Sequence, residues 1–211
     1  MKKAVLLIML VALFMPVVAS AAVFTLDQSN LVGLTGGPWA TVTLTDTSGG
    51  GRDGVHFVVD PLESAFTSIG SNFGIQTFYF NENTSFGSQL ILTNFDPAGW
   101  SWNYTSPGGA NAGGGFGKFE FLASGSGSTR ANPLSFDVFA PPGQSLTIEN
   151  LSTALSTEGY IFAGHIADFN GGNSAKFATD GAASVPEPGT MLLLGSGLVG
   201  LAGYGRKRLK K

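Results

Sequence analysis

A short segment near the middle of the chain carries the residues best suited to binding a ligand. Trp100, Trp102 and Tyr104 alternate with Ser101 and Asn103. In a β-strand, alternate side chains point to one face and lie roughly 7 Å apart. Three flat rings on an exposed face would stack on the apolar faces of sugar rings, whereas the same rings on a buried face would form core. Trp100, Trp102 and Tyr104 are therefore candidate carbohydrate-binding residues, with a core role as the alternative.

The two histidines, His56 and His165, each lie inside an apolar segment that is typical of a strand. An imidazole together with a carboxylate such as Asp60 or Asp168 could ligate a metal. A histidine that is hydrogen-bonded within the core is the commoner arrangement in such a strand. We therefore expect no metal site at either histidine.

Two polar loops, residues 46–53 and 168–173, have the composition of calcium-binding loops. Calcium prefers hard oxygen ligands on flexible turns, but neither loop follows the full spacing of a calcium loop. The same Asp, Asn, Ser and Gly residues also form ordinary turns. We expect plain turns here, with no metal and no cofactor.

The sequence gives little support for catalysis. It contains no cysteine, so thiolate nucleophiles and Cys-ligated zinc are excluded, and no Gly-x-Ser-x-Gly elbow is present. Residues 195–200 match Gly-x-Gly-x-x-Gly but follow no strand, so we do not expect a dinucleotide there. Five glutamates lie between the two chain ends and could pair as in a glycoside hydrolase, although their spacing does not favour it.

The N-terminus has the three parts of a secretory signal peptide. Lys2 and Lys3 precede an apolar run over residues 4–18, and Ala19-Ser-Ala21 offers the small residues that signal peptidase accepts. The apolar run is too short for a comfortable membrane span. We predict a signal peptide over residues 1–21 and a mature chain that begins near Ala22.

The C-terminus also has three parts: Val-Pro-Glu-Pro-Gly at 185–189, an apolar stretch at 190–204 and a basic end at 206–211. As a helix, the apolar stretch would span about 22 Å, which is less than the hydrocarbon core of roughly 30 Å, and the basic end could snorkel. Basic residues favour the cytoplasmic side, so both chain ends would stay inside while the part between them crosses the inner membrane.

This order of motif, apolar helix and basic end resembles the PEP-CTERM sorting signal of Gram-negative bacteria. The resemblance implies that exosortase, a membrane-embedded protease, recognises Pro186, Glu187 and Pro188 and removes the tail after transient anchoring in the inner membrane. It also implies a host that makes exopolysaccharide and forms biofilm. The central region is weakly similar to other PEP-CTERM proteins, which brings no known activity. The tail therefore indicates a destination at the cell surface or in the extracellular matrix.

Charge limits the partners of the central region. Residues 22–184 hold thirteen acidic and four basic side chains, a net charge of −9. Such a surface repels phosphate backbones, which excludes nucleic acid as a partner and favours neutral or amine-bearing polymers. Without cysteine, the core alone must stabilise the fold, and sixteen of the 17 phenylalanines lie outside the signal peptide.

Alternation of apolar and polar residues predicts strands over most of the central region. Half-buried strands are expected at residues 40–45, 118–123, 135–138 and 146–149. Central strands are expected where both faces are apolar, at 55–59 and 160–166, and further strands at 75–80 and 89–95. Gly-rich exposed loops are expected at 106–115 and 124–128, and one helical turn within 61–69.

These patterns predict an all-β fold, an antiparallel β-sandwich with jelly-roll-like connectivity over residues 22–184. A signal helix precedes it, and a transmembrane sorting helix follows within the tail at 185–211. We predict an exported, exosortase-processed, non-enzymatic protein of the cell surface or matrix, with signal peptidase and exosortase as export partners and carbohydrate or exopolysaccharide as a hypothetical ligand. The alternatives are a secreted polysaccharide hydrolase, which needs two facing glutamates in a groove, and a purely structural matrix protein.

Overall fold

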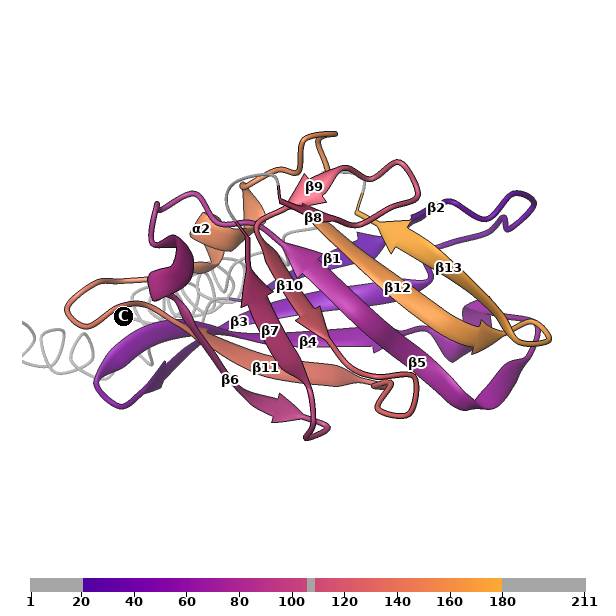
Figure 1. The fold of residues 1–211 in the computed structure, drawn as a ribbon, viewed down its shortest axis with the longest axis horizontal. Helices are drawn as coiled ribbons and strands as arrows, with labels where there is room; N and C mark the ends of the chain where they lie inside the picture. Colours follow the sequence, from indigo (N-terminus) through magenta and orange to yellow (C-terminus); the bar gives the residue numbers. More distant parts are fainter. Residues whose placement is uncertain (1–20, 106–108, 180–211) are drawn as a thin grey trace, which may run out of the picture. The chain divides into compact units, whose positions relative to one another are not determined.

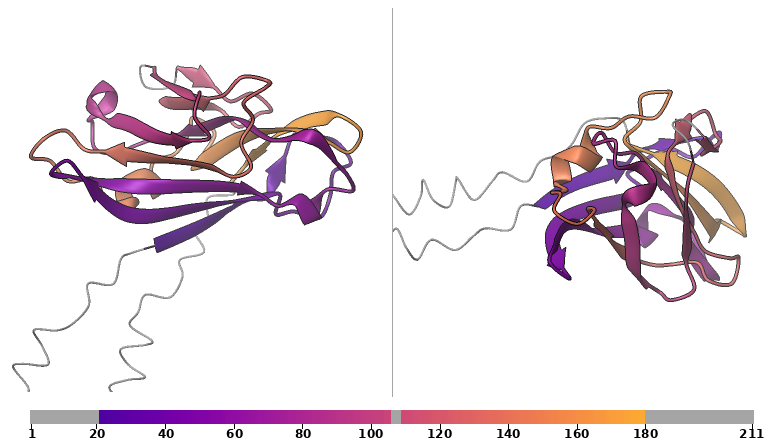
Figure 2. Two further views of the ribbon diagram at one scale, coloured as in Figure 1. Left: turned by 90° about the horizontal axis from the view of Figure 1, so that it is seen from below. Right: turned by 60° about the vertical axis from the view of Figure 1, so that its left-hand side comes forward.

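Two antiparallel sheets pack face to face in the computed structural model, which describes residues 21–105 and 109–179 (Figures 1 and 2). The five-stranded sheet has the order β1 (Ala21–Leu26), β3 (Ala40–Gly49), β4 (Arg52–Pro61), β11 (Leu134–Phe139) and β6 (Ile91–Asp96). The six-stranded sheet has the order β2 (Gln28–Ser29), β13 (Asn173–Ala178), β12 (Phe162–Phe169), β5 (Ile69–Phe80), β10 (Phe121–Ser124) and β7 (Ser101–Tyr104).

This arrangement confirms the predicted antiparallel β-sandwich. β4 is the middle strand of its sheet, and β12 is an interior strand of the other, as expected for segments that are apolar on both faces. Jelly-roll connectivity stays a prediction. The signal helix and the sorting helix fall outside the described residues.

Phenylalanine side chains from both sheets fill the space between the layers. Phe57 and Phe136 of the five-stranded sheet are stacked with ring centroids 4.8 Å apart, and Phe78 of the six-stranded sheet lies 6.1 Å from Phe57. All three rings are fully buried. Burying each such ring contributes about 2–3 kcal/mol, so the aromatic core can hold the fold without disulfides.

A small hairpin, β8 (Ala110–Asn111) with β9 (Lys118–Phe119), packs on the outer face of the six-stranded sheet (Figure 1). Its buried side chains, Ala110 and Phe119, form a second apolar cluster with Tyr79 and Ala163 of that sheet. The expectation of an exposed loop over 106–115 is therefore wrong for residues 110–112, whereas Gly114 and Gly115 do lie in an exposed turn. Small alanines give a weak strand signal, yet they allow the hairpin to lie close to the sheet.

The strand expected at residues 146–149 is also wrong. A short helix, α2 (Ile148–Ser152), begins there, and the Thr147 amide donates to Asn150 Oδ1 at 2.9 Å in a capping box. Four alternating residues fit both a strand and the start of a helix, and the cap decides between them. The helical turn expected within 61–69 is present as the 3₁₀ helix η1 (Glu63–Ala65); a second, η2 (Gly87–Gln89), precedes β6.

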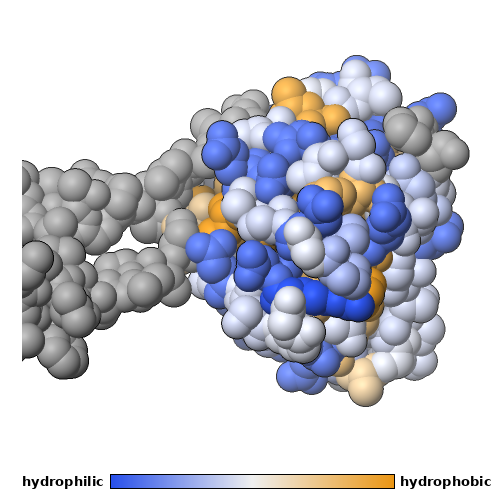
Figure 3. Space-filling view, turned by 90° about the vertical axis from the view of Figure 1, so that its left-hand side faces the viewer, coloured by the Kyte–Doolittle hydropathy of each residue, from blue (hydrophilic) through white to orange (hydrophobic). Residues whose placement is uncertain are grey.

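The end of the domain that carries α2 and the β3–β4 hairpin is largely hydrophilic (Figure 3). On this face, apolar residues form small separate groups among polar ones. This face therefore offers polar groups, rather than a broad apolar patch, to a partner.

Candidate functional site

The aromatic row around β7 points into the sandwich. Trp100, just before the strand, is only 8% exposed, and its Nε1 donates to the Thr129 carbonyl at 2.8 Å. Trp102 and Tyr104 are half-buried and pack against the main core, with the Tyr104 ring 5.2 Å from that of Phe121. The three rings share one face, but that face belongs to the core.

The outer face of β7 presents Ser101 and Asn103, which are both exposed. Sequence periodicity places Trp100, Trp102 and Tyr104 on a common face but cannot say which face is buried. The row therefore supplies no open aromatic platform for a sugar.

His56 is hydrogen-bonded, but on the outer face of the five-stranded sheet. Its Nδ1 lies 2.6 Å from Asp137 Oδ1, and Asp137 Oδ2 accepts a hydrogen bond from Asn94 Nδ2 at 2.7 Å. The His56 side chain is 38% exposed. Sequence analysis missed Asp137, because the pairing of His56 with Asp137 depends on the register of β4 against β11.

His165 lies on the outer face of the six-stranded sheet, opposite Lys176 and Thr77 on the neighbouring strands. Burial lowers its pKa, and the charges of Lys176 and Arg130 lower it further. Asp60 lies on the five-stranded sheet, where it pairs with Thr41, and so it is not near His165. Across the described residues, no three His, Asp or Glu side chains gather as metal ligands.

The two loops with calcium-like composition are hairpin turns, β3–β4 and β12–β13. Asn170 Oδ1 accepts hydrogen bonds from the Thr67 amide at 2.8 Å and the Thr67 hydroxyl at 2.7 Å. Asp168 Oδ2 accepts one from the Asn72 amide at 2.9 Å. These oxygens already have protein partners that fix the turn.

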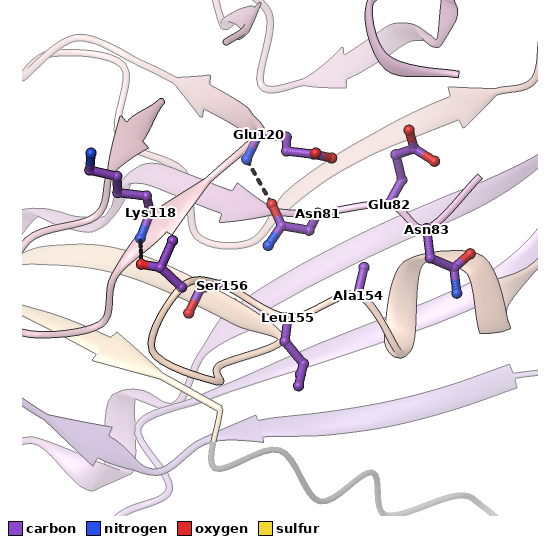
Figure 4. Close-up of a pocket in the computed structure, with 9 residues that line it drawn as sticks. Asn81, Glu82, Asn83, Lys118, Glu120, Ala154, Leu155 and Ser156 are labelled. Carbon is purple, nitrogen blue, oxygen red and sulfur yellow. Dashed lines mark hydrogen bonds between the residues drawn. The ribbon is translucent and has the colours of Figure 1, made fainter. Parts of the chain in front are cut away.

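A pocket of about 280 Å³, lined mainly by polar residues, is formed by three segments that are far apart in sequence (Figure 4). They are the residues after β5, the β9–β10 region and the residues after α2. We call it the amide–carboxylate pocket; its lining is Asn81, Glu82, Asn83, Lys118, Glu120, Ala154, Leu155, Ser156 and Thr157. Figure 4 shows Lys118 at one end, Glu82 and Asn83 at the other, and Glu120 with Asn81 between them.

Hydrogen bonds between these segments hold the pocket together. Asn81 Oδ1 accepts from the Glu120 amide at 2.7 Å, and the Thr157 hydroxyl accepts from the Lys118 amide at 3.0 Å. Ser156 Oγ donates to the Phe116 carbonyl at 2.9 Å. These side chains thus fix the backbone around the pocket, and the side chain of Lys118 takes no part in these bonds.

Glu82 is fixed in place by its own loop. Its carboxylate accepts hydrogen bonds from the Gly87 amide at 3.0 Å and from the amide and hydroxyl of Thr84. The residue is only 9% exposed. Glu82 therefore acts first as a structural acceptor for the loop.

Glu120 has less internal support. Burial raises its pKa, the Glu82 charge raises it further, and a backbone hydrogen bond from Glu82 acts in the opposite direction. Its Oε2 is buried without a hydrogen-bond partner among the described residues. An unsatisfied buried oxygen of this kind is unfavourable, and a ligand that donates a hydrogen bond would relieve it.

A second hollow, of about 480 Å³, adjoins the pocket and shares Lys118 and Thr157 with it. Asn111, Glu158 and the glycines of the β8–β9 turn complete its lining. Asn111 Oδ1 accepts the Gly113 amide at 2.8 Å, which shapes this turn. Sequence analysis missed both hollows, because no short-range pattern connects their lining segments.

The C-terminal residues give a separate and specific finding. Residues 184–208 match the family model of the PEP-CTERM protein-sorting motif, and Pro186, Glu187 and Pro188 lie inside this match. The chain carries a PEP-CTERM sorting signal. This signal implies export, transient membrane anchoring and processing by exosortase. The matched residues lie outside those that the structure describes, and the described part contains no helix long and apolar enough to cross a membrane.

No curated protein and no solved structure matches the chain. The sorting signal covers a small part of it and does not include the β-sandwich.

Proposed function

We propose that this chain is an exosortase-processed protein of the cell surface or extracellular matrix whose β-sandwich binds neutral or amine-bearing polysaccharide without cleaving it. The observation that carries the proposal is the amide–carboxylate pocket with the unpartnered Glu120 oxygen. The proposed destination rests on the sorting signal. The resemblance to proteins of exopolysaccharide-producing bacteria supports a polysaccharide as the ligand.

The chemistry of the pocket suits sugars. Each sugar hydroxyl can donate and accept: the Asn81 amide nitrogen and the Thr157 hydroxyl can donate to it, and the Glu120 carboxylate can accept from it. Leu155, 54% exposed at the pocket, offers an apolar contact for a ring face. The carboxylates of Glu82 and Glu120, in a domain of net charge −9, favour an amine-bearing sugar over an acidic one.

Glu120→Gln tests the proposal, with purified full-length protein in mild detergent and soluble chitosan and dextran as probes. We expect chitosan to bind more tightly than dextran, and Glu120→Gln to weaken chitosan binding about fivefold through loss of a charge-assisted contact. Glu149→Gln makes the same chemical change on α2, outside the pocket, and should leave binding unchanged. Equal effects of the two variants would contradict the pocket assignment. Retention of neither polymer would favour a purely structural matrix protein.

A second candidate function, polysaccharide hydrolysis, rests on the same two glutamates. Glycosidases use a carboxyl group of raised pKa as acid and a second carboxylate as base or nucleophile. The raised pKa of Glu120 beside Glu82 fits the first role, whereas the three hydrogen bonds that Glu82 accepts argue against the second. Release of reducing ends from chitosan by the wild type, abolished in Glu120→Gln, would overturn the non-enzymatic proposal.

A further inference from the structure

One row of polar side chains crosses the outer face of the six-stranded sheet. In the order β13, β12, β5, β10 and β7, directly paired residues are Lys176, His165, Thr77, Ser124 and Ser101. We call these five residues the cross-strand row. Neighbouring strands lie about 4.8 Å apart, so the row extends over roughly 19 Å. Figure 1 shows the five strands side by side on the face that also carries β8 and β9.

The row lies beside the β8–β9 hairpin. The next row of the same face, which includes Tyr79 and Ala163, is buried beneath that hairpin. Lys176 lies at the border between the two rows, with its Nζ 5.8 Å from the centre of the Tyr79 ring. The residues of the cross-strand row are half-buried to exposed, although the Thr77 hydroxyl itself is buried without a partner among the described residues.

Two cations lie near the row, on opposite sides of it: Lys176 reaches toward Tyr79, and Arg130 binds the carbonyl of Asn72. The described residues contain four Lys or Arg side chains, and two of them, Lys176 and Arg130, act on the charge of His165. Ala131 is buried in the core, so the side chain of its neighbour Arg130 turns to the outer face, where Nη1 donates to the Asn72 carbonyl at 3.1 Å. Burial lowers the pKa of Lys176 as well as that of His165.

These cations have no internal counter-ion, although acidic residues outnumber basic ones in the domain. Within residues 21–105 and 109–179, the single ion pair is His56 with Asp137, on the other sheet. Asp168, at the far end of β12, binds the Asn72 amide instead, and Arg130 Nε is buried without a partner. Partly buried cations without an anion are unfavourable, and such groups concentrate where a ligand supplies the missing charge.

We propose that the cross-strand row, together with Arg130, binds a carboxylate-bearing polysaccharide. Lys176 meets the carboxylate of one sugar and Arg130 that of another, and the hydroxyls of Ser124 and Ser101, which lie 3.4 Å apart, contact a further sugar. The linear extent of the row favours a polymer over a compact anion such as phosphate, which needs donors that converge on one point. This site lies outside the amide–carboxylate pocket and takes ligands of the opposite charge, so it goes beyond the function proposed above.

The test compares polygalacturonate with its methyl ester, which keeps the sugar chain and removes the charge. Purified full-length protein in mild detergent should bind the acid form at least about tenfold more tightly than the ester. Lys176→Gln should lose about tenfold in affinity for polygalacturonate, which corresponds to one charge-assisted contact. Arg52→Gln, the matched control, removes the same charge at the β3–β4 hairpin and should change affinity less than about twofold.

Ser101→Ala provides a second variant that does not threaten folding, because Ser101 is exposed on an edge strand. It should weaken polygalacturonate binding about threefold and leave the melting temperature unchanged. Equal binding of acid and ester, no binding of either, or equal losses in Lys176→Gln and Arg52→Gln would overturn the proposal. Tighter binding of inorganic polyphosphate than of polygalacturonate, unaffected by Ser101→Ala, would show a general anion site and also overturn it.

Discussion

The imidazole of His56 and the carboxylate of Asp137 lie 2.6 Å apart on adjacent strands of the five-stranded sheet. Asn94 donates to the other carboxylate oxygen, so Asp137 links β4 to β6 across β11 through side chains as well as through the backbone. This polar link lies on the outer face, on the opposite side of the sheet from the stacked rings of the neighbouring residues Phe57 and Phe136.

Asp137→Ala should reduce stability modestly. It removes two side-chain hydrogen bonds at a partly exposed position, and the expected loss in free energy of unfolding is about 1 kcal/mol. Asp60→Ala, at an exposed position on the same face, is the control and should have little effect. Urea unfolding of both variants measures the difference, and equal midpoints would show that the His56–Asp137 contact adds nothing.

Trp102→Ala should destabilise the domain, because the ring packs on the core from the edge strand. A half-buried tryptophan leaves a partial cavity when removed, so we expect a loss of about 2–3 kcal/mol, below the range for fully buried aromatics. Asn103→Ala, the neighbouring outward residue, should change stability by less than about 0.5 kcal/mol. A normal melting temperature for Trp102→Ala would restore the exposed-platform interpretation of this row.

The aromatic row shows how far sequence reasoning reaches in a β-sandwich. Period-two alternation predicted many of the strands, although it missed β1 and β13 and was wrong at 146–149. It grouped Trp100, Trp102 and Tyr104 correctly on one face, since this signal is local. Which face becomes core depends on the position of β7 at the sheet edge, which is a tertiary property. The same limit applies to His56 and Asp137, which are separated by 81 residues and joined only by strand register.

The amide–carboxylate pocket was beyond sequence reasoning for a related reason. Asn81, Lys118 and Thr157 meet only because the β9–β10 region crosses the end of β5 and the segment after α2 returns beside it. No spacing rule connects such residues. The net charge of −9 over residues 22–184, in contrast, could be calculated from the sequence, because it depends on composition and not on contacts.

Glu120→Gln should raise stability near neutral pH. The pKa of Glu120 is raised above 4.5 in the folded state, so between the unfolded and folded pKa values the native protein binds more protons than the unfolded chain. Stability from this group is therefore present below about pH 4.5 and is lost as pH rises through the folded pKa. Between pH 3.5 and 7.5, the melting temperature of the variant should rise relative to that of the wild type as pH rises. A melting temperature of the variant that falls relative to that of the wild type as pH rises would contradict the assignment.

Calcium should have little effect on the melting temperature. Asp168 and Asn170 already accept backbone amides from the segment before β5 and the start of that strand, so a bound ion would have to displace these contacts. We expect a shift of less than about one degree in millimolar calcium, because an ion that does not bind the folded state cannot stabilise it. A rise of several degrees that disappears in Asp168→Ala would show that the β12–β13 turn is a calcium site.

The C-terminal tail should be absent from the protein recovered at its destination. The sorting signal spans residues 184–208, and its Pro186-Glu-Pro188 precedes the apolar stretch at 190–204. That stretch is short for a permanent anchor, about 22 Å as a helix against roughly 30 Å of hydrocarbon, which suits a transient one. Exosortase processing should remove residues 190–211 in the native host, and Glu187→Ala should leave the full-length form in the membrane fraction. Intact-mass measurement of the surface-exposed protein distinguishes the two forms, and a surface pool that still ends at Lys211 would show that export proceeds without removal of the tail.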